Sequence, residues 1–548
     1  MLRILICLLA YSCVASAQCR FSHTKREGTV TYRFTPLPEA TGLKLHLTVG
    51  FVMPSTGLQN LALPGEWAGE KLHSLSHLQA TSRGAFLDSP SVSGNVVLHG
   101  PANHFVVVEY DLQRDWADPL VNPLQFHPIL MPEYMEFTGS NALIRRVLSD
   151  DAEETADFDW QDLPATWTLA TSFGTSATAT SRCQTFKGPW NRVQEGLYAA
   201  GDYRIHTFTI AGQPAYLAIR GKWTFTDDEA IQDIQKTVGT VRNFWGDNDF
   251  PYYLVTISPF DRDHGSADGS EFTNAFWMFV SRLDRLDGLL PTLAHESFHT
   301  WNPGKMGVVP TGYDGNKIKW FREGPTDYYG QLLTYRAGLL SAADYVDSLN
   351  VALRRFSTTD DEYVRGRVIA LWIDGTIRRE SGGRKSLDNV MFDLVRQKDE
   401  PYTLERILAV IDRFLSPSSQ DQLQAAVSRH GSLTMPAQLP ILGSCAKATL
   451  GNYPTFDLGF DIDKSQTSKV VSGVADGGPA FRAGLRNGDK LLGMSYSKHD
   501  PDRQARFTIA FQDGSKRITY LPQGSPEQAW QYSLDSSLPC EGVATSKD

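Results

Sequence analysis

Two histidines and a glutamate occur in the segment LAHESFHTWN, in a spacing that suits a metal site. His295 and His299 are four residues apart, so on a helix their imidazoles lie on one face, one turn apart, and can bind the same ion. Glu296 then lies beside that ion instead of on it and can act as a general base. The spacing therefore predicts a zinc centre with hydrolytic chemistry.

The same spacing also occurs by chance on helices that face solvent. In this chain the other positions of the predicted helix are apolar: Leu290, Leu293, Ala294 and Phe298. His295 and His299 thus belong to a largely buried helix, in which polar side chains need a partner. A bound zinc ion is such a partner, and this favours the metal site over a solvated polar face.

A catalytic zinc ion keeps one position open for water, so it needs a third protein ligand. The segment WFREGPTDYYG offers Glu323. Pro303-Gly304 ends the first helix, and a second helix is expected to begin near Trp320, with Glu323 in its first turn. Asp327 follows on the same face, where it can accept the free ring N–H of a zinc-bound histidine. We therefore expect one zinc ion per chain, bound by His295, His299 and Glu323.

These motifs carry a family resemblance. H-E-x-x-H followed by E-G-x-x-D resembles the thermolysin-type (gluzincin) metallopeptidases, in which the third ligand is a glutamate on the next helix. H-E-x-F-H-x-W-N, W-F-x-E-G-x-T-x-Y-Y, R-A-G-L at 336–339 and a PDZ-like C-terminal part resemble the glycyl aminopeptidase family of zinc metallopeptidases, over roughly residues 200–545. The resemblance implies an enzyme that hydrolyses peptide bonds with zinc-activated water and Glu296 as general base.

Within that family the expected activity is an aminopeptidase that favours a small N-terminal residue, Gly or Ala, on a peptide or protein substrate. Two alternatives stay open. One is a zinc endopeptidase, and the other is a PDZ-bearing binding protein whose peptidase scaffold is inactive. The presence of all the motif residues together argues against the inactive scaffold: His295, Glu296, His299, Glu323 and Asp327.

Tyr363 opens the string YVRGRVIALWID. This string resembles the Y-x-K-G segment of related zinc aminopeptidases, and the resemblance implies that the Tyr363 hydroxyl hydrogen-bonds the developing oxyanion. The alternative is an ordinary tyrosine of an amphipathic helix. Tyr328 and Tyr329 are expected to pack in the core beside the third ligand.

An aminopeptidase also needs a group that binds the substrate amine. Many relatives carry G-G-x-E-H before the zinc helix for this purpose, whereas this chain has GSADG at 265–269. Asp268 is the first candidate for the amine anchor and Glu271 the second. A solvated acidic loop is the alternative for both, and exopeptidase and endopeptidase action both stay open.

Composition excludes one class of partner. A hydrophobic fraction of 41% and a charged fraction of 21% are ordinary for a globular protein, and 548 residues are enough for several domains. The net charge is -10, and we find no stretch dense in Lys and Arg. Because nucleic-acid binding needs a basic surface, nucleic acid is not an expected partner.

The first residues predict export. MLRILICLLAYSCVASAQC combines Arg3, a short apolar run and small residues before a cleavage point after Ala17. This pattern predicts a signal peptide over residues 1–17 and an extracytoplasmic protein, secreted or periplasmic. The run is too short to span a bilayer and no other stretch is long enough, so we expect no transmembrane segment.

Four cysteines would remain after cleavage: Cys19, Cys183, Cys445 and Cys540. They allow three pairings, among which the sequence alone does not choose. Their positions suggest Cys19 with Cys183, which bracket the first region, and Cys445 with Cys540, which bracket the last. An oxidising compartment favours such disulfides over free thiols.

The predicted fold is multidomain α+β. A β-sandwich-like domain is expected over residues 18–190, where apolar or alternating runs are separated by turns. A thermolysin-like domain, with a mixed sheet followed by helices, is expected over residues 191–440. A PDZ-like β domain is expected over residues 441–548.

The PDZ-like resemblance rests on Leu458-Gly459-Phe460 and on GGPAFRAGLRNGDKLLGM at 477–494. In such domains the glycine-containing loop binds the terminal carboxylate of a peptide, and the neighbouring strand pairs with that peptide. Residues 495–507 have little of the amphipathic helix that forms the other wall of the groove. Binding of a peptide C-terminus and a purely structural role therefore both remain open.

Overall fold

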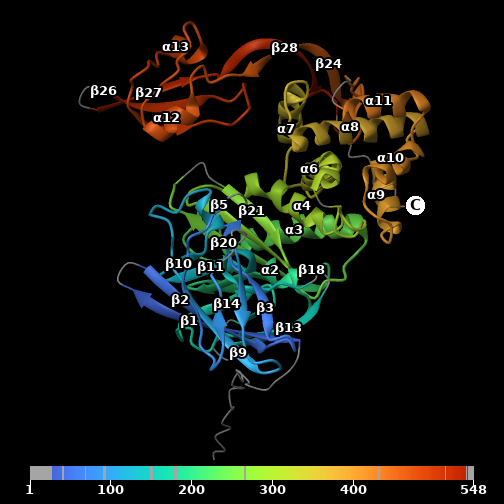
Figure 1. Ribbon diagram of the computed structural model, residues 1–548. Helices are drawn as coiled ribbons and strands as arrows, with labels where there is room; N and C mark the ends of the chain where they lie inside the picture. Colours follow the sequence, from blue (N-terminus) through green and yellow to red (C-terminus); the bar gives the residue numbers. More distant parts are fainter. Residues whose placement is uncertain are drawn as a thin grey trace, which may run out of the picture. The chain divides into compact units, whose positions relative to one another are not determined.

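The computed structural model describes residues 28–39, 42–67, 70–89, 94–148, 152–176, 182–263, 267–310, 312–428, 432–511, 514–538 and 540. The predicted signal peptide, Cys19 and the first residues of the GSADG segment lie outside these ranges. The chain forms two compact units, Met1–Ile231 with Asn248–Leu286 and Gln232–Asp247 with Asp287–Asp548. Sheets make up the first unit and helices much of the second, which confirms a multidomain α+β protein (Figure 1). The predicted domain bounds remain predictions.

The first unit begins with three sheets. The largest has the order β16 (Cys183–Pro189), β13 (Glu153–Asp159), β1 (Thr29–Glu39), β2 (Gly42–Val52), β9 (Phe105–Leu112) and β6 (Leu75–Ala80). A second has the order β12 (Arg145–Arg146), β3 (Leu58–Ala62), β8 (Asn95–His99) and β7 (Phe86–Leu87). The third has the order β10 (Ile129–Met131), β11 (Tyr134–Thr138), β17 (Leu197–Gly201), β14 (Thr168–Thr171) and β15 (Gly174–Ser176).

Short elements complete this part of the unit. They are the hairpin β4 (Glu66–Trp67) and β5 (Glu70–Lys71), the 3-10 helix η1 (Leu124–Phe126), α1 (Gly139–Ala142) and α2 (Asn191–Gln194).

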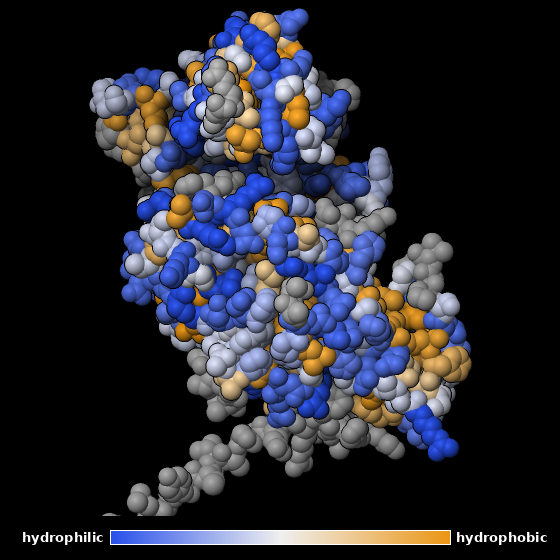
Figure 2. Space-filling view, turned by 90° about the vertical axis from the view of Figure 1, so that its left-hand side faces the viewer, coloured by the Kyte–Doolittle hydropathy of each residue, from blue (hydrophilic) through white to orange (hydrophobic). Residues whose placement is uncertain are grey.

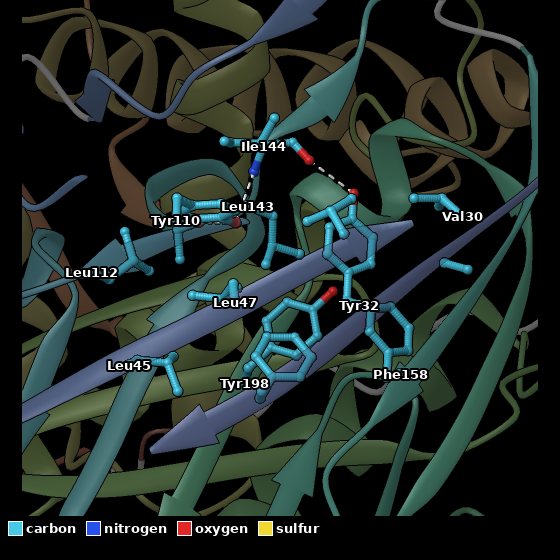
Figure 3. Packing of buried hydrophobic residues seen from close by; sticks show 14 of the residues in the cluster. Val30, Tyr32, Leu45, Leu47, Tyr110, Leu112, Leu143, Ile144, Phe158 and Tyr198 are labelled. Atoms are coloured by element: carbon cyan, nitrogen blue, oxygen red, sulfur yellow. Dashed lines mark hydrogen bonds between the residues drawn. The ribbon is translucent and has the colours of Figure 1, made fainter. Parts of the chain in front are cut away.

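One hydrophobic core is shared by these three sheets. In β2 every second residue from Leu43 to Val49 is buried, as expected for a strand with one face in the core. Two buried tyrosines of this core hydrogen-bond to the backbone of Ile144 (Figure 3). Tyr32 donates to the Ile144 carbonyl at 2.9 Å, and the Tyr110 hydroxyl accepts from the Ile144 N–H at 3.2 Å. The apolar and alternating runs thus form the predicted β-rich region.

A mixed sheet follows, in the order β18 (Arg204–Ile210), β19 (Gln213–Ile219), β20 (Tyr253–Phe260), β22 (Ala275–Ser281) and β21 (Ala267–Phe272). β20 is parallel to both of its neighbours, and the edge strand β21 is antiparallel to β22. Glu136 of β11 is buried and accepts hydrogen bonds from Thr256 and Ser258 of β20 at 2.6 and 2.7 Å. This buried carboxylate joins the mixed sheet to the preceding one, and burial raises its pKa.

Helices continue the chain from here. α3 (Asp227–Trp245) begins in the first unit and ends in the second. The second unit then contains η2 (Asp287–Leu289), α4 (Leu290–His299), α5 (Gly312–Lys317), α6 (Lys319–Arg336), α7 (Ala342–Arg355), α8 (Glu362–Ser381), α9 (Leu387–Arg396), α10 (Leu404–Asp412) and α11 (Pro417–Val427). Helices thus follow the mixed sheet, as predicted.

The end of the second unit is a small β module, residues 438–538. One sheet has the order β23 (Gln438–Leu439), β24 (Gly443–Phe456) and β28 (Gln523–Leu534), of which β24 and β28 form a long pair (Figure 1). The other has the order β25 (Leu491–Ser495), β26 (Ala505–Phe511) and β27 (Gly514–Tyr520). The helices α12 (Ile462–Ser468) and α13 (Pro479–Ala483) lie between β24 and β25 in the chain.

The predicted disulfide between Cys445 and Cys540 is present. Cys183 is disulfide-bonded as well, and its predicted pairing with Cys19 remains a prediction.

None of the helices that the structure describes is long and apolar enough to cross a membrane. The face shown in Figure 2 is mostly hydrophilic, and its hydrophobic residues gather most at the lower right.

Candidate active site

α4 carries both histidines of the predicted metal site. Pro291 stands at its start, where a missing backbone N–H costs nothing. Leu293, Ala294 and Phe298 are fully buried, and His295 is only 6% exposed. The helix ends at His299, before Pro303-Gly304, as the sequence predicts. The histidines therefore belong to a buried helix and not to a solvated polar face.

α6 carries the predicted third ligand, and the loop after α4 stabilises it. Pro325 lies inside α6 and has no N–H to donate to the carbonyl of Phe321. The buried amide of Asn302 donates to that carbonyl instead, at 3.1 Å, and also to Thr326 Oγ1 at 3.0 Å. The side-chain oxygen Oδ1 of Asn302 in turn accepts from the Tyr402 hydroxyl at 2.5 Å. The residues next to Glu323 are thus positioned by the loop that follows the histidines.

Glycines allow the three helices to approach one another at the site. A Cβ at Gly330 of α6 would lie 2.9 Å from the Pro291 carbonyl oxygen of α4. A Cβ at Gly324 would lie 2.2 Å from the Gly366 backbone, so α6 and α8 touch where only hydrogen atoms fit. Gly324 follows Glu323 and Gly366 lies near Tyr363, which brings those side chains to one place.

The predicted ligand atoms converge. Glu323 Oε2 lies 3.7 Å from His295 Nε2 and 3.3 Å from His299 Nε2. Oε2 is buried without a hydrogen-bond partner, whereas Oε1 accepts from Arg322 Nε at 2.9 Å. Two imidazole nitrogens and an unpartnered carboxylate oxygen form a donor set that zinc accepts. The residues therefore fit a zinc ion.

Two carboxylates lie near the histidines, and their surroundings separate their roles. Glu296 can also approach both, since potential ligand atoms of His295, Glu296 and His299 lie within 4.8 Å of one another. Glu323 is nevertheless the better candidate for the third ligand, because it is 4% exposed and its Oε2 has no hydrogen-bond partner. Glu296 is only partly buried, which suits a base that exchanges protons with water.

Hydrogen bonds and nearby charges favour metal binding by the histidines and Glu323. His299 Nδ1 lies 2.8 Å from the Asn302 carbonyl oxygen, which can only accept, so Nδ1 carries the hydrogen and Nε2 is left to bind the ion. Burial alone would raise the pKa of Glu323, but the neighbouring imidazoles of His295 and His299 hold it well below its usual range. Burial alone would lower the pKa of His299, but Glu323 and Glu296 raise it. Negative charge therefore dominates the site.

Tyr363 lies at the site, near the start of α8. Its ring stacks on that of His295 with the centroids 5.8 Å apart, and its side chain remains partly exposed. Burial raises the pKa of Tyr363, and the charges of Glu323 and Glu296 raise it further, so the hydroxyl keeps its proton. This placement favours the oxyanion role over that of an ordinary helix tyrosine.

Asp327 approaches one histidine, at a distance too long for a hydrogen bond. Asp327 Oδ1 lies 3.9 Å from His295 Nδ1, and its Oδ2 lies 3.6 Å from Arg367. The expected acceptor for a ligand histidine is thus beside His295, while His299 uses a backbone carbonyl. Tyr328 and Tyr329 are buried, and their hydroxyls donate to carboxylates of α8 and α9, in agreement with a packing role.

The two candidates for the amine anchor lie on opposite faces of β21. Asp268 accepts hydrogen bonds from Asn122 and Gln125 at 2.9 and 2.6 Å and from the Gly269 N–H. Its burial raises its pKa. Glu271 accepts from the Tyr253 hydroxyl at 2.7 Å. Because residues an odd number of positions apart alternate in a strand, the two carboxylates cannot serve one site together.

The predicted carboxylate loop lies in the C-terminal module. Leu458 is buried, Phe460 is partly buried, and the Gly459 N–H donates to Asp457 at 2.7 Å. α12 begins directly after Asp461, where peptide binding would require a strand edge, and residues 496–504 contain no helix. This arrangement favours the structural role that the sequence left open.

Comparison with known proteins agrees with the site. The profile of the M61 glycyl aminopeptidase family matches residues 288–370. This segment contains the histidines, Glu323 and Tyr363. The match and the geometry support a peptidase.

Among solved structures, an aminopeptidase N family protein from Idiomarina loihiensis is similar with a TM-score of 0.65 and 17% identity, over 92% of this chain and 98% of the other. An M1 zinc metallopeptidase from Deinococcus radiodurans has a TM-score of 0.48 and 15% identity, over 75% of this chain and 95% of the other. The comparison with curated proteins returned no significant match. The fold is thus similar to that of an aminopeptidase N family protein.

Three residues of the site were not expected from the sequence: Arg322, Asn302 and Arg367. Arg322 pairs with Glu323, Asn302 fixes His299 and α6, and Arg367 contacts Asp327. Asn302 lies in the W-N pair that follows the second histidine, which was the available signal. The other two are arginines on helices, and their positions carry no distinguishing pattern.

Proposed function

We propose that this protein is a zinc aminopeptidase that removes small N-terminal residues from peptides. The observation that carries the proposal is the convergence of His295 Nε2, His299 Nε2 and the unpartnered Glu323 Oε2, with Glu296 and Tyr363 beside them. A zinc ion bound there would supply a Lewis acid that polarises the scissile carbonyl and acidifies water. His295, His299 and Glu323 would hold it.

Glu296 transfers protons in the proposed reaction, and Tyr363 stabilises the developing charge. Glu296 takes the proton of the attacking water and later delivers it to the leaving amine. Tyr363 stays protonated and donates a hydrogen bond to the carbonyl oxygen as negative charge develops there. Arg322 and Asn302 hold Glu323 and His299 in place, so these groups need little rearrangement during the reaction.

For the amine anchor Asp268 and Glu271 both remain candidates. Asp268 accepts hydrogen bonds from two side-chain amides and Glu271 from the Tyr253 hydroxyl, so a substrate amine would have to compete with existing partners at either carboxylate. Glu271 lies on the other face of the edge strand. A carboxylate makes a charge-assisted hydrogen bond to the protonated amine of the substrate. Acetylation removes the charge of the amine and with it this hydrogen bond, so N-acetylated substrates are rejected.

Export is part of the proposal. The pattern of residues 1–17 supports it, and so does the disulfide between Cys445 and Cys540, since disulfides persist mainly in oxidising compartments.

The test compares free and N-acetylated glycyl and alanyl peptides with purified full-length protein, and measures its zinc content. We expect about one zinc ion per chain and cleavage of the free peptides alone. Equal cleavage of free and acetylated peptides would instead indicate an endopeptidase. No cleavage of either, by protein that holds its zinc, would reject the peptidase and favour the inactive scaffold.

A further inference from the structure

A cavity of about 300 Å³ lies among α6, α7, α8 and the 497–503 segment of the C-terminal module. The three helices pack against one another (Figure 1). Asp327 and Arg367 line the cavity, and so does Val364, the residue after Tyr363. The cavity thus borders the residues around the metal site, and the mechanism above gives it no role.

The guanidinium of Arg367 is buried in the wall of this cavity and is only partly paired. Its side chain is 7% exposed. Nη1 donates to Ser348 Oγ at 3.1 Å and lies 3.6 Å from Asp327 Oδ2, whereas Nη2 is buried without a hydrogen-bond partner. A buried charged donor without an acceptor is costly. The planar guanidinium suits a carboxylate, which would supply the missing oxygen.

Contacts between α7 and the C-terminal module hold the cavity open. The buried side chain of Arg354 donates from Nη1 to Asp502 at 2.6 Å, and its Nη2 lies 3.8 Å from Asp500. The Asn350 side chain accepts from the Tyr532 N–H and donates to the Tyr532 carbonyl, at 2.8 and 2.9 Å. Because these contacts lie within the protein, the cavity is formed before a ligand binds.

The acidic residues of the lining leave Arg367 Nη2 unpaired. Asp500 pairs with Arg354 and with Arg503, and Asp327 lies between Arg367 Nη1 and His295. Two further aspartates of the lining, Asp344 and Asp347, oppose a second carboxylate. The remaining basic residues of the lining offset them: Arg355, the exposed Lys498 and Arg503. A carboxylate that reaches Arg367 therefore meets one buried donor without a partner and additional basic residues.

We infer that this cavity is a carboxylate-binding subsite of the peptidase centre, in which Arg367 Nη2 pairs with a carboxylate of the substrate. The inference rests on the proposed function. Contacts of 3.6 Å from Arg367 to Asp327 and 3.9 Å from Asp327 to His295 separate the guanidinium from the metal site. A peptide of a few residues, at about 3.3–3.6 Å each, spans such a separation. The carboxylate is the C-terminal group of a short peptide or the side chain of an Asp or Glu residue.

The test uses zinc-loaded, full-length enzyme and peptide pairs that differ by one charge. Alanyl di-, tri- and tetrapeptides are compared as free acids and as C-terminal amides, and amidated peptides are compared with Glu or Gln at each position after the first. The readout is the ratio of kcat/KM within each pair. We expect the carboxylate member of one pair to be favoured about 10- to 100-fold, as one hydrogen bond to a charged group gives. The pair that responds identifies the source of the carboxylate.

Arg367→Gln should reduce that ratio to about one, and Arg367→Lys should give an intermediate value. Arg365→Gln is the matched control, because Arg365 is an equally buried arginine of α8 that donates to the carbonyls of Phe356 and Ala426. It should keep the wild-type ratio. A ratio measured within one variant is insensitive to a general loss of activity. If Arg367→Gln does not fold, the ratios measured with the wild-type enzyme still test whether a carboxylate is favoured.

If both members of every peptide pair are cleaved at equal rates, the subsite is refuted. It is also refuted if Arg367→Gln keeps the full preference for the carboxylate member. Neither result affects the peptidase proposal. If no peptide is cleaved, calorimetry with the same pairs and Glu296→Gln protein separates the two proposals. Tighter binding of one carboxylate member supports the subsite although the peptidase proposal fails. Equal or undetectable binding overturns the subsite.

Discussion

Replacing Gly366 by alanine should push α8 away from α6 and slow the enzyme. A Cβ at this position would lie 2.0 Å from the Trp320 carbonyl oxygen and 2.7 Å from Gly324 Cα, whereas real Cβ contacts essentially never fall below 3.0 Å. The backbones must therefore separate by about 1 Å. Overpacking of this kind costs about 1–3 kcal/mol of folding free energy. A displacement of about 1 Å between catalytic groups costs about 10²-fold in rate, and here Tyr363 and Glu323 are displaced.

The assay measures kcat/KM for a free alanyl substrate with zinc in excess, together with zinc content and thermal unfolding. Gly288→Ala is the control, since a Cβ at Gly288 meets nothing within 4 Å. We expect about a 10²-fold loss of kcat/KM in Gly366→Ala and no change in Gly288→Ala. Wild-type kcat/KM in a folded Gly366→Ala protein would refute the idea that the glycine contact positions Tyr363 against Glu323.

Four further predictions concern the site itself. His299→Ala should lose the zinc ion, measured by metal analysis, because it removes one of three protein ligands; full zinc content would remove His299 from the set. Glu296→Gln should keep the zinc yet lose turnover by several orders of magnitude. Tyr363→Phe should lower kcat by about 10²–10³-fold, and a normal kcat in this variant would indicate that Tyr363 has only a packing role. Glu271→Gln should raise KM or lower kcat/KM for free-amine peptides, with Asp268→Asn as its comparison, and an unchanged Glu271→Gln enzyme would count against this anchor.

The grouping of the two histidines could be predicted from the sequence because its geometry is largely local. Helical spacing alone places His295 and His299 on one face, and the apolar residues between them indicate burial. Glu323 could be assigned because the motif around it is compact and lies on the next long helix. The distance between Glu323 and the histidines depends on helix contacts, which the spacing does not encode.

The residues that support the ligands could not be predicted in the same way, because each bridges segments far apart in the chain. Asn302 compensates for the missing N–H of Pro325 and also accepts from Tyr402. The sequence does not show which group would donate in place of that N–H, whereas the structure shows Asn302 doing so beside an unbroken α6. Arg367 contacts Asp327 and Ser348 from two other helices. Such pairings become visible only when the packing of the helices is known.

Once the secondary structure is known, the alternation of side chains along a strand separates the two candidates for the amine anchor. In the sequence, Asp268 and Glu271 are two acidic residues of one glycine-containing segment, and the segment was expected to be a loop. The structure makes it the edge strand β21, in register with β22 so that Asp268 pairs with Phe279 and Glu271 with Phe276. The three-residue spacing then puts the carboxylates on opposite faces. A substrate amine can meet only one of them, so one of the two substitutions should impair recognition of free amines and the other should not.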